Sequence, residues 1–89
     1  MESIITNKES CYLCGSTQHL QIHHCWHGSN RKLADKDGLT VKLCMSCHIQ
    51  LHDKGIADRY LMEIAERAYL SHYHKTIGDF IERYGKNVI

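Results

Sequence analysis

The chain has 89 residues, which is enough for one small domain whose limited core is often supplemented by a metal ion or a disulfide. A hydrophobic fraction of 43% argues against a disordered chain, and no apolar run approaches the roughly 20 residues that span a membrane. The formal net charge of +1 neither favours nor excludes a nucleic-acid partner, because positive charge can be local or can come from a metal.

The first ten residues are polar and predict a flexible N-terminal arm over residues 1–10. They contain no basic start followed by an apolar run, so we expect no secretory signal and a reducing, cytoplasmic setting. In such a compartment paired cysteines are more often metal ligands than disulfides.

Alternating residues predict a half-buried strand over residues 19–25, with Leu20, Ile22 and His24 on one face. Residues 26–38 are polar and read as a loop that Trp26 anchors; a connection of 13 residues in so small a domain is typical of a functional loop. A second strand is expected over residues 39–43, with its apolar side chains on one face.

Helical patterns follow the second strand. One helix is expected from about Ser46 to a stop at Gly55, and a longer one over residues 56–74 with Glu66 pointing away from its apolar stripe. The spacing Thr76-x-x-Asp79 predicts a capping box that opens a last short helix. The expected class is therefore α+β.

Four of the five cysteines form two C-x2-C pairs separated by residues 15–43. Two tight turns that present two thiolates each suit tetrahedral zinc, and we interpret the group as a structural Zn²⁺ site rather than as two disulfides or a redox pair. Cys25 is expected to be an ordinary packing residue. The expected zinc ligands are Cys11, Cys14, Cys44 and Cys47.

Eight histidines are the main outlier of the composition. His23 and His24 are adjacent in a predicted strand and should point to opposite faces, so they do not easily bind the same ion. His48 and His52 are four residues apart, which puts them on one face of a helix, one turn apart.

These histidines, with the spacing from His24 to His48 and the zinc pairs around them, resemble the HNH endonucleases. The resemblance implies a zinc-clasped ββα-metal (HNH, or His-Me finger) core over residues 11–55, followed by a C-terminal extension of two helices over residues 56–89 packed on that core. The four-cysteine clasp is similar to that of the larger zinc-bearing branch of the family, which is found in phages and mobile elements. Residues 76–89 resemble the tail of small phage-encoded members.

The resemblance also implies roles for individual residues. His23, His48 and His52 would bind one divalent ion (Mg²⁺, Mn²⁺, Ni²⁺ or Zn²⁺), and His24 would be the general base. Where the family often has an asparagine, this chain has Leu39, and Asn30 in the loop is the alternative catalytic candidate.

The implied activity is hydrolysis of DNA phosphodiester bonds, by nicking or by double-strand cleavage. Positive side chains of the loop, Arg31, Lys32 and Lys36, would contact phosphates, although they also fit a solvated mixed surface. Expected partners are DNA, a possible second copy of the chain and other phage or recombination proteins, but no membrane. The alternative is a catalytically inactive, zinc-clasped module that binds DNA or protein.

Overall fold

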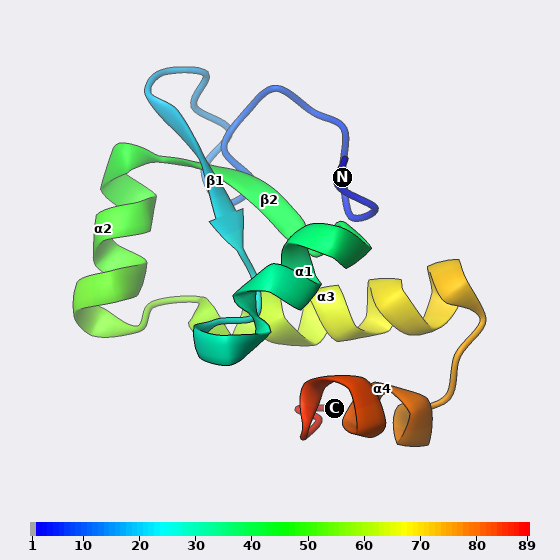
Figure 1. Ribbon diagram of the computed structural model, residues 1–89. Helices are drawn as coiled ribbons and strands as arrows, with labels where there is room; N and C mark the ends of the chain where they lie inside the picture. Colours follow the sequence, from blue (N-terminus) through cyan, green and yellow to red (C-terminus); the bar gives the residue numbers. More distant parts are fainter. Residues whose placement is uncertain (1) are drawn as a thin grey trace.

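The computed structural model describes residues 2–89, which form a small α+β fold (Figure 1). Within this range a two-stranded antiparallel sheet is accompanied by four α-helices and one short 3-10 helix, η1. None of these helices combines the length and the apolar character that crossing a bilayer requires. In chain order the elements are β1 (Leu20–His24), η1 (Gly28–Asn30), α1 (Arg31–Asp37), β2 (Thr40–Cys44), α2 (Met45–Lys54), α3 (Asp58–Tyr73) and α4 (Ile77–Tyr84).

The two strands lie where the sequence predicts them, and their register pairs Leu20 with Cys44 and His24 with Thr40. The face of β1 that contains His23 is the buried one: Ile22, on the opposite face, is 61% exposed, whereas His23 is buried. His23 faces α2, and its ring lies 5.3 Å from the ring of His48. Because side chains alternate along a strand, burying His23 turns Ile22 outward.

The prediction of a polar loop over residues 26–38 is wrong, because this segment contains η1 and the helix α1. Ala34 and Asp37, three residues apart, form its buried side. Gly38 ends the helix with a φ of +76°, and its N–H bonds the last carbonyls of α1. Because α1 is short and mostly charged, its sequence has no apolar periodicity that would predict a helix.

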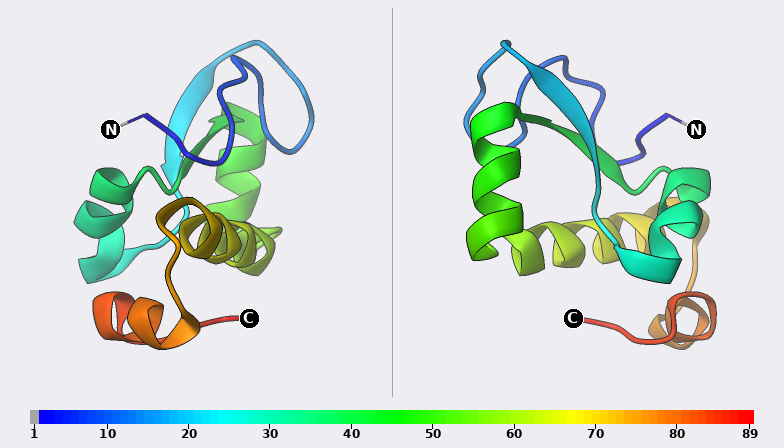
Figure 2. Two further views of the ribbon diagram at one scale, coloured as in Figure 1. Left: turned by 90° about the vertical axis from the view of Figure 1, so that its right-hand side faces the viewer. Right: turned by 60° about the vertical axis from the view of Figure 1, so that its left-hand side comes forward.

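The antiparallel pair of β1 and β2 is called the hairpin below. Helix α3 runs beneath the hairpin, and α4 lies on the side of α3 that faces away from the hairpin (Figures 1 and 2). The indole of Trp26 joins these layers: it donates to the Met62 carbonyl at 3.3 Å, and its ring lies 5.0 Å from Phe80 and 5.4 Å from Tyr84. The loop after β1 is thereby anchored as predicted. The capping box at the start of α4 is confirmed, with Thr76 and Asp79 bonded reciprocally.

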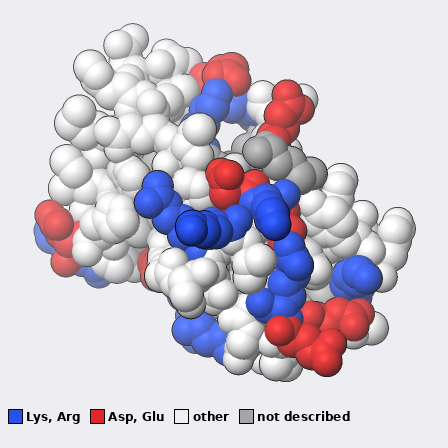
Figure 3. Space-filling model, viewed as in Figure 1, with Lys and Arg blue, Asp and Glu red and all other residues white. Residues whose placement is uncertain are grey.

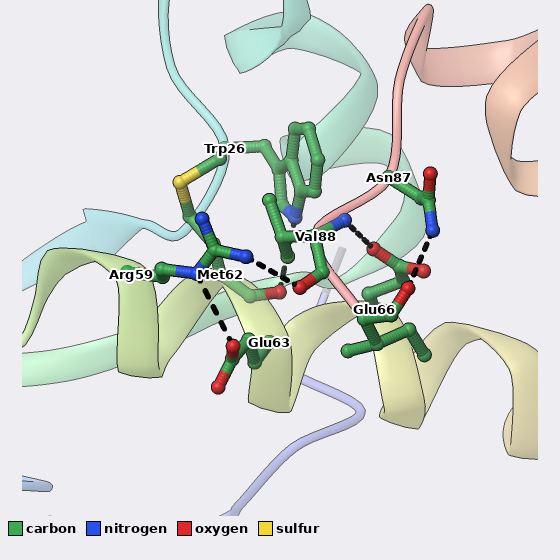
Figure 4. A network of polar contacts seen from close by, with 8 residues as sticks. Trp26, Arg59, Met62, Glu63, Glu66, Asn87 and Val88 are labelled. Atoms are coloured by element: carbon green, nitrogen blue, oxygen red, sulfur yellow. Dashed lines mark hydrogen bonds and ion pairs between the residues drawn. The ribbon is translucent and has the colours of Figure 1, made fainter.

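The C-terminal tail folds back along α3 (Figure 4). The Val88 N–H donates to the Glu66 carboxylate at 2.7 Å, and Arg59 donates to the Val88 carbonyl at 3.0 Å. Glu66 is therefore buried, contrary to its predicted position away from the core. A polar partner 22 residues away explains why the amphipathic pattern misplaces it.

The start of the chain also contacts the sheet. Ser3 donates to the Thr40 carbonyl, and the Ile4 N–H donates to the Gly38 carbonyl at 2.9 Å. Ile4 and Ile5 pack against the core. Met1, the first residue of the predicted arm, lies outside the described residues.

Candidate metal centres and the histidine cluster

The two cysteine pairs converge at the end of the hairpin. Cys11 and Cys14 lie in the turn before β1, Cys44 ends β2, and Cys47 is in the first turn of α2. The four sulfur atoms all lie within 4.8 Å of one another, and the Cys14 and Cys44 sulfurs are 3.7 Å apart. Tetrahedral zinc with Zn–S bonds of about 2.3 Å requires sulfurs about 3.8 Å apart. The group therefore fits a structural metal such as zinc.

The backbone around this group favours a thiolate. Burial raises the pKa of the Cys11 thiol, but backbone hydrogen bonds at Cys44 and Cys14 outweigh it, and the pKa falls to about 6. Burial and the neighbouring thiols raise the pKa of Cys47 to about 12. One thiol is thus ready to lose its proton, and a bound cation would favour the same change in the others. Cys25 is buried elsewhere in the core, as expected.

Three predicted metal ligands come together beside the sheet. His23 extends from β1, while His48 and His52 project from successive turns of α2. One ring nitrogen from each lies within 4.8 Å of the others, and the Nε2 atoms of His48 and His52 are 3.1 Å apart. Gln21 contacts the other nitrogen of His48, Nδ1, at 2.6 Å.

His23 is suited to metal binding by its environment. Its side chain is 2% exposed, and its Nε2 has no hydrogen-bond partner among residues 2–89. Burial, followed by the neighbouring His27 and His48, lowers its pKa to about 4. The ring is therefore neutral at pH 7 and keeps a lone pair, as a nitrogen ligand must.

His24 points away from this cluster and towards α1. Its Nε2 lies 3.1 Å from an Asp35 carboxylate oxygen, and Arg31 donates to its Nδ1 at 3.4 Å. The hydrogen bond to His24 lowers the pKa of Asp35. Asp35 is not among the predicted site residues, because the ten residues between it and His24 include a turn and part of a helix.

Asn30 is directed elsewhere. Its amide donates to the Tyr84 carbonyl in α4 at 2.9 Å, so the structure joins it to the C-terminal helix rather than to the histidines. The backbone carbonyl of Leu39 accepts the N–H of Cys25 at 2.9 Å, which fixes the chain directly after the histidine pair.

The three predicted phosphate-binding side chains, Arg31, Lys32 and Lys36, are exposed on α1. Figure 3 shows basic side chains across the middle of the face on which α1 lies, with acidic groups beside them. The surface is therefore locally positive but mixed.

Two further side chains of metal-ligating type, whose position the sequence did not indicate, adjoin His23. The Nε2 of His27 lies 2.7 Å from the carboxylate of Asp58, at the start of α3. His23, His27 and Asp58 also present ligand atoms within 4.8 Å of one another. Neither a strand nor a helix relates these residues in the sequence, so no periodic pattern could have found them.

Searches against protein-family models, curated protein sequences and solved structures found no match for this chain.

Proposed function

We propose that the protein is a metal-dependent DNA endonuclease of the HNH type, acting on DNA in the cytoplasm. The observation that carries the proposal is the convergence of His23, His48 and His52 on one side of β1, with His24 held by a carboxylate on the other side. The order β1, β2, α2, with two histidines on the helix, supports a ββα-metal core. A phage origin is proposed from the resemblance alone.

The ligand set suits the expected ion. Three neutral imidazoles bind Zn²⁺, Ni²⁺ and similar divalent ions, and three protein ligands leave coordination positions open for water or phosphate. A divalent ion bound there would stabilise the negative charge that develops on the phosphate and on the leaving oxygen.

His24 is the proposed general base. Asp35 accepts a hydrogen bond from Nε2–H and so keeps the lone pair on Nδ1, the nitrogen that Arg31 contacts. When Arg31 turns to a phosphate oxygen, Nδ1 is free to take a proton from water. The water oxygen then attacks phosphorus and the bond from phosphorus to the 3′ oxygen breaks. The leaving 3′ oxygen takes a proton from solvent, which gives a 5′ phosphate and a 3′ hydroxyl.

Helix α1 is the proposed DNA contact. It carries Asp35 and Arg31 beside His24, and Lys32 and Lys36 are exposed on the same helix. Contacts to phosphate oxygens would position the backbone without reading sequence, and they should weaken as salt rises.

One observation favours the second candidate, a binding module without catalysis. Both ring nitrogens of His24 are engaged, one by Asp35 and the other by Arg31, so neither is open to water in this conformation. In such a module α1 would bind DNA or protein, and the cysteine group would maintain the fold.

Supercoiled plasmid distinguishes the two candidates. Wild-type protein, with its bound zinc measured, is incubated with Mg²⁺, Mn²⁺, Ni²⁺ or EDTA and compared with His24→Ala and with His72→Ala, which replaces an exposed histidine of α3. We expect metal-dependent nicking that His72→Ala retains and His24→Ala lowers by about 10²-fold or more, the usual contribution of a general base. Equal cleavage by both variants would refute the role of His24, and DNA binding without cleavage by the wild type would favour the module.

A further inference from the structure

We propose that His27 and Asp58, together with His23, form a second ligand set for a divalent cation, adjoining the three-histidine set and sharing His23 with it. The proposal depends on the proposed function only in taking His23 as a metal ligand. It requires no DNA cleavage.

The contacts of His27 define the second set. Its ring centroid lies 5.2 Å from that of His23 and 6.5 Å from that of His52, and its Nε2 is 2.7 Å from an Asp58 oxygen. The ligand atoms of His23, His27 and Asp58 lie within 4.8 Å of one another, the same limit that the three-histidine set meets. Four imidazoles and one carboxylate therefore surround one small volume.

His23 supplies an independent reason to expect a cation here. Its side chain is 2% exposed, and Nε2 has no partner in the part of the chain that the structure describes. An unsatisfied polar atom in the interior is destabilising, and an ion in contact with it would remove that penalty. His27 and Asp58 are only partly covered, so an ion can reach the set from solvent.

The two sets differ in the ions that they prefer. Three imidazoles suit Ni²⁺ and Zn²⁺, whereas a carboxylate adds negative charge and an oxygen donor, which suit Mn²⁺. Because both sets include His23 and converge on one small volume, two divalent ions bound at the same time would repel each other. The structure thus predicts competition between Mn²⁺ and Ni²⁺ for one histidine.

The test measures binding of the metals themselves. Full-length protein with zinc already bound at the cysteines is titrated with Mn²⁺, followed by the electron paramagnetic resonance of free Mn²⁺, and separately with Ni²⁺ by calorimetry. The variants are Asp58→Asn, His27→Gln, His48→Ala and His23→Ala. Asp53→Asn, which alters an exposed carboxylate of α2 outside both sets, is the matched control, and circular dichroism verifies folding.

We expect Asp58→Asn and His27→Gln to weaken Mn²⁺ binding by at least about tenfold while Ni²⁺ binding is largely kept, and His48→Ala to do the reverse. His23→Ala should weaken both, and added Ni²⁺ should release bound Mn²⁺ from the wild type. Mn²⁺ binding by Asp58→Asn and His27→Gln equal to that of Asp53→Asn would overturn the proposal, as would a wild type that binds no Mn²⁺. Mn²⁺ binding that needs Asp58 in a protein that cuts no DNA would uphold this inference and refute the nuclease.

Discussion

Replacing Asp37 by alanine should destabilise the protein, because the Asp37 carboxylate joins α1 to α4 by hydrogen bonds. The Asp37 carboxylate accepts hydrogen bonds from Arg83 Nε at 2.6 Å, Arg83 Nη2 at 2.8 Å and the Tyr84 hydroxyl at 2.7 Å. Removing one member of a fully buried ion pair costs about 3–5 kcal/mol. The Arg83 side chain is 37% exposed and can regain water, so much of that cost is recovered.

The larger remaining loss comes from Tyr84, which is 3% exposed and would keep a hydroxyl without a partner, at about 1–3 kcal/mol. We therefore expect Asp37→Ala to lower the free energy of unfolding by about 2–3 kcal/mol. For a domain of this size that corresponds to a fall in Tm of about 10–20 °C.

Thermal and urea unfolding followed by circular dichroism measure this loss, with Lys36→Ala as the exposed neighbour that should change stability by less than about 0.5 kcal/mol. A second substitution, Arg83→Met, should cost less in the Asp37→Ala background than in the wild type, because the pair is already broken. An Asp37→Ala variant as stable as Lys36→Ala would refute the reasoning.

Three further predictions concern turns, the cysteine group and α4. In urea unfolding, Gly38→Ala should destabilise the protein by more than Gly55→Ala, for which we expect a loss of roughly 1–2 kcal/mol. Both glycines have positive φ, but a Cβ on Gly38 would lie 2.5 Å from a backbone oxygen of the N-terminal segment, whereas a Cβ on Gly55 would meet open space. Equal losses in the two variants would contradict the contact at Gly38. Cys14→Ala should abolish stoichiometric zinc binding, measured by mass spectrometry, and lower Tm, whereas Cys25→Ala should keep the bound zinc. Zinc retained by Cys14→Ala would show that Cys14 is not a ligand. A hydrogen bond from the N-cap N–H lowers the pKa of Asp79. The stability that the Asp79 carboxylate contributes is therefore present above its unfolded pKa of about 4 and is lost as pH falls through its folded pKa. The stability of Asp79→Asn, measured by acid unfolding, should depend less on pH in that range, and curves parallel to the wild type would count against this contribution.

Local chemistry made part of the molecule predictable. The C-x2-C pairs, the i, i+4 spacing of His48 and His52, and the capping box at Thr76 each depend on residues close together in the chain, and the structure contains all three. Gly55 ends α2 as its conformational freedom predicts.

Features set by distant partners could not be predicted in this way. Asp37 is buried because Arg83 and Tyr84 arrive from a helix 46 and 47 residues away, and Glu66 is buried because the tail returns to it. His27 and Asp58 meet although η1, α1, β2 and α2 lie between them in the sequence. In each case the sequence shows an ordinary polar residue, and only the tertiary fold gives it a partner.

The position of the cysteine group relative to the hairpin has a consequence for the folding pathway. Cys14 and Cys44 enclose 29 residues, and Cys44 is itself the register partner of Leu20 at the end of the sheet. Closing a loop of that length costs about 3–4 kcal/mol of chain entropy, and without a metal the pairing of the two strands must offset this cost alone. A cation captured early by the four thiolates would make that search local and align the strands in register. Refolding should therefore be faster with zinc than without it.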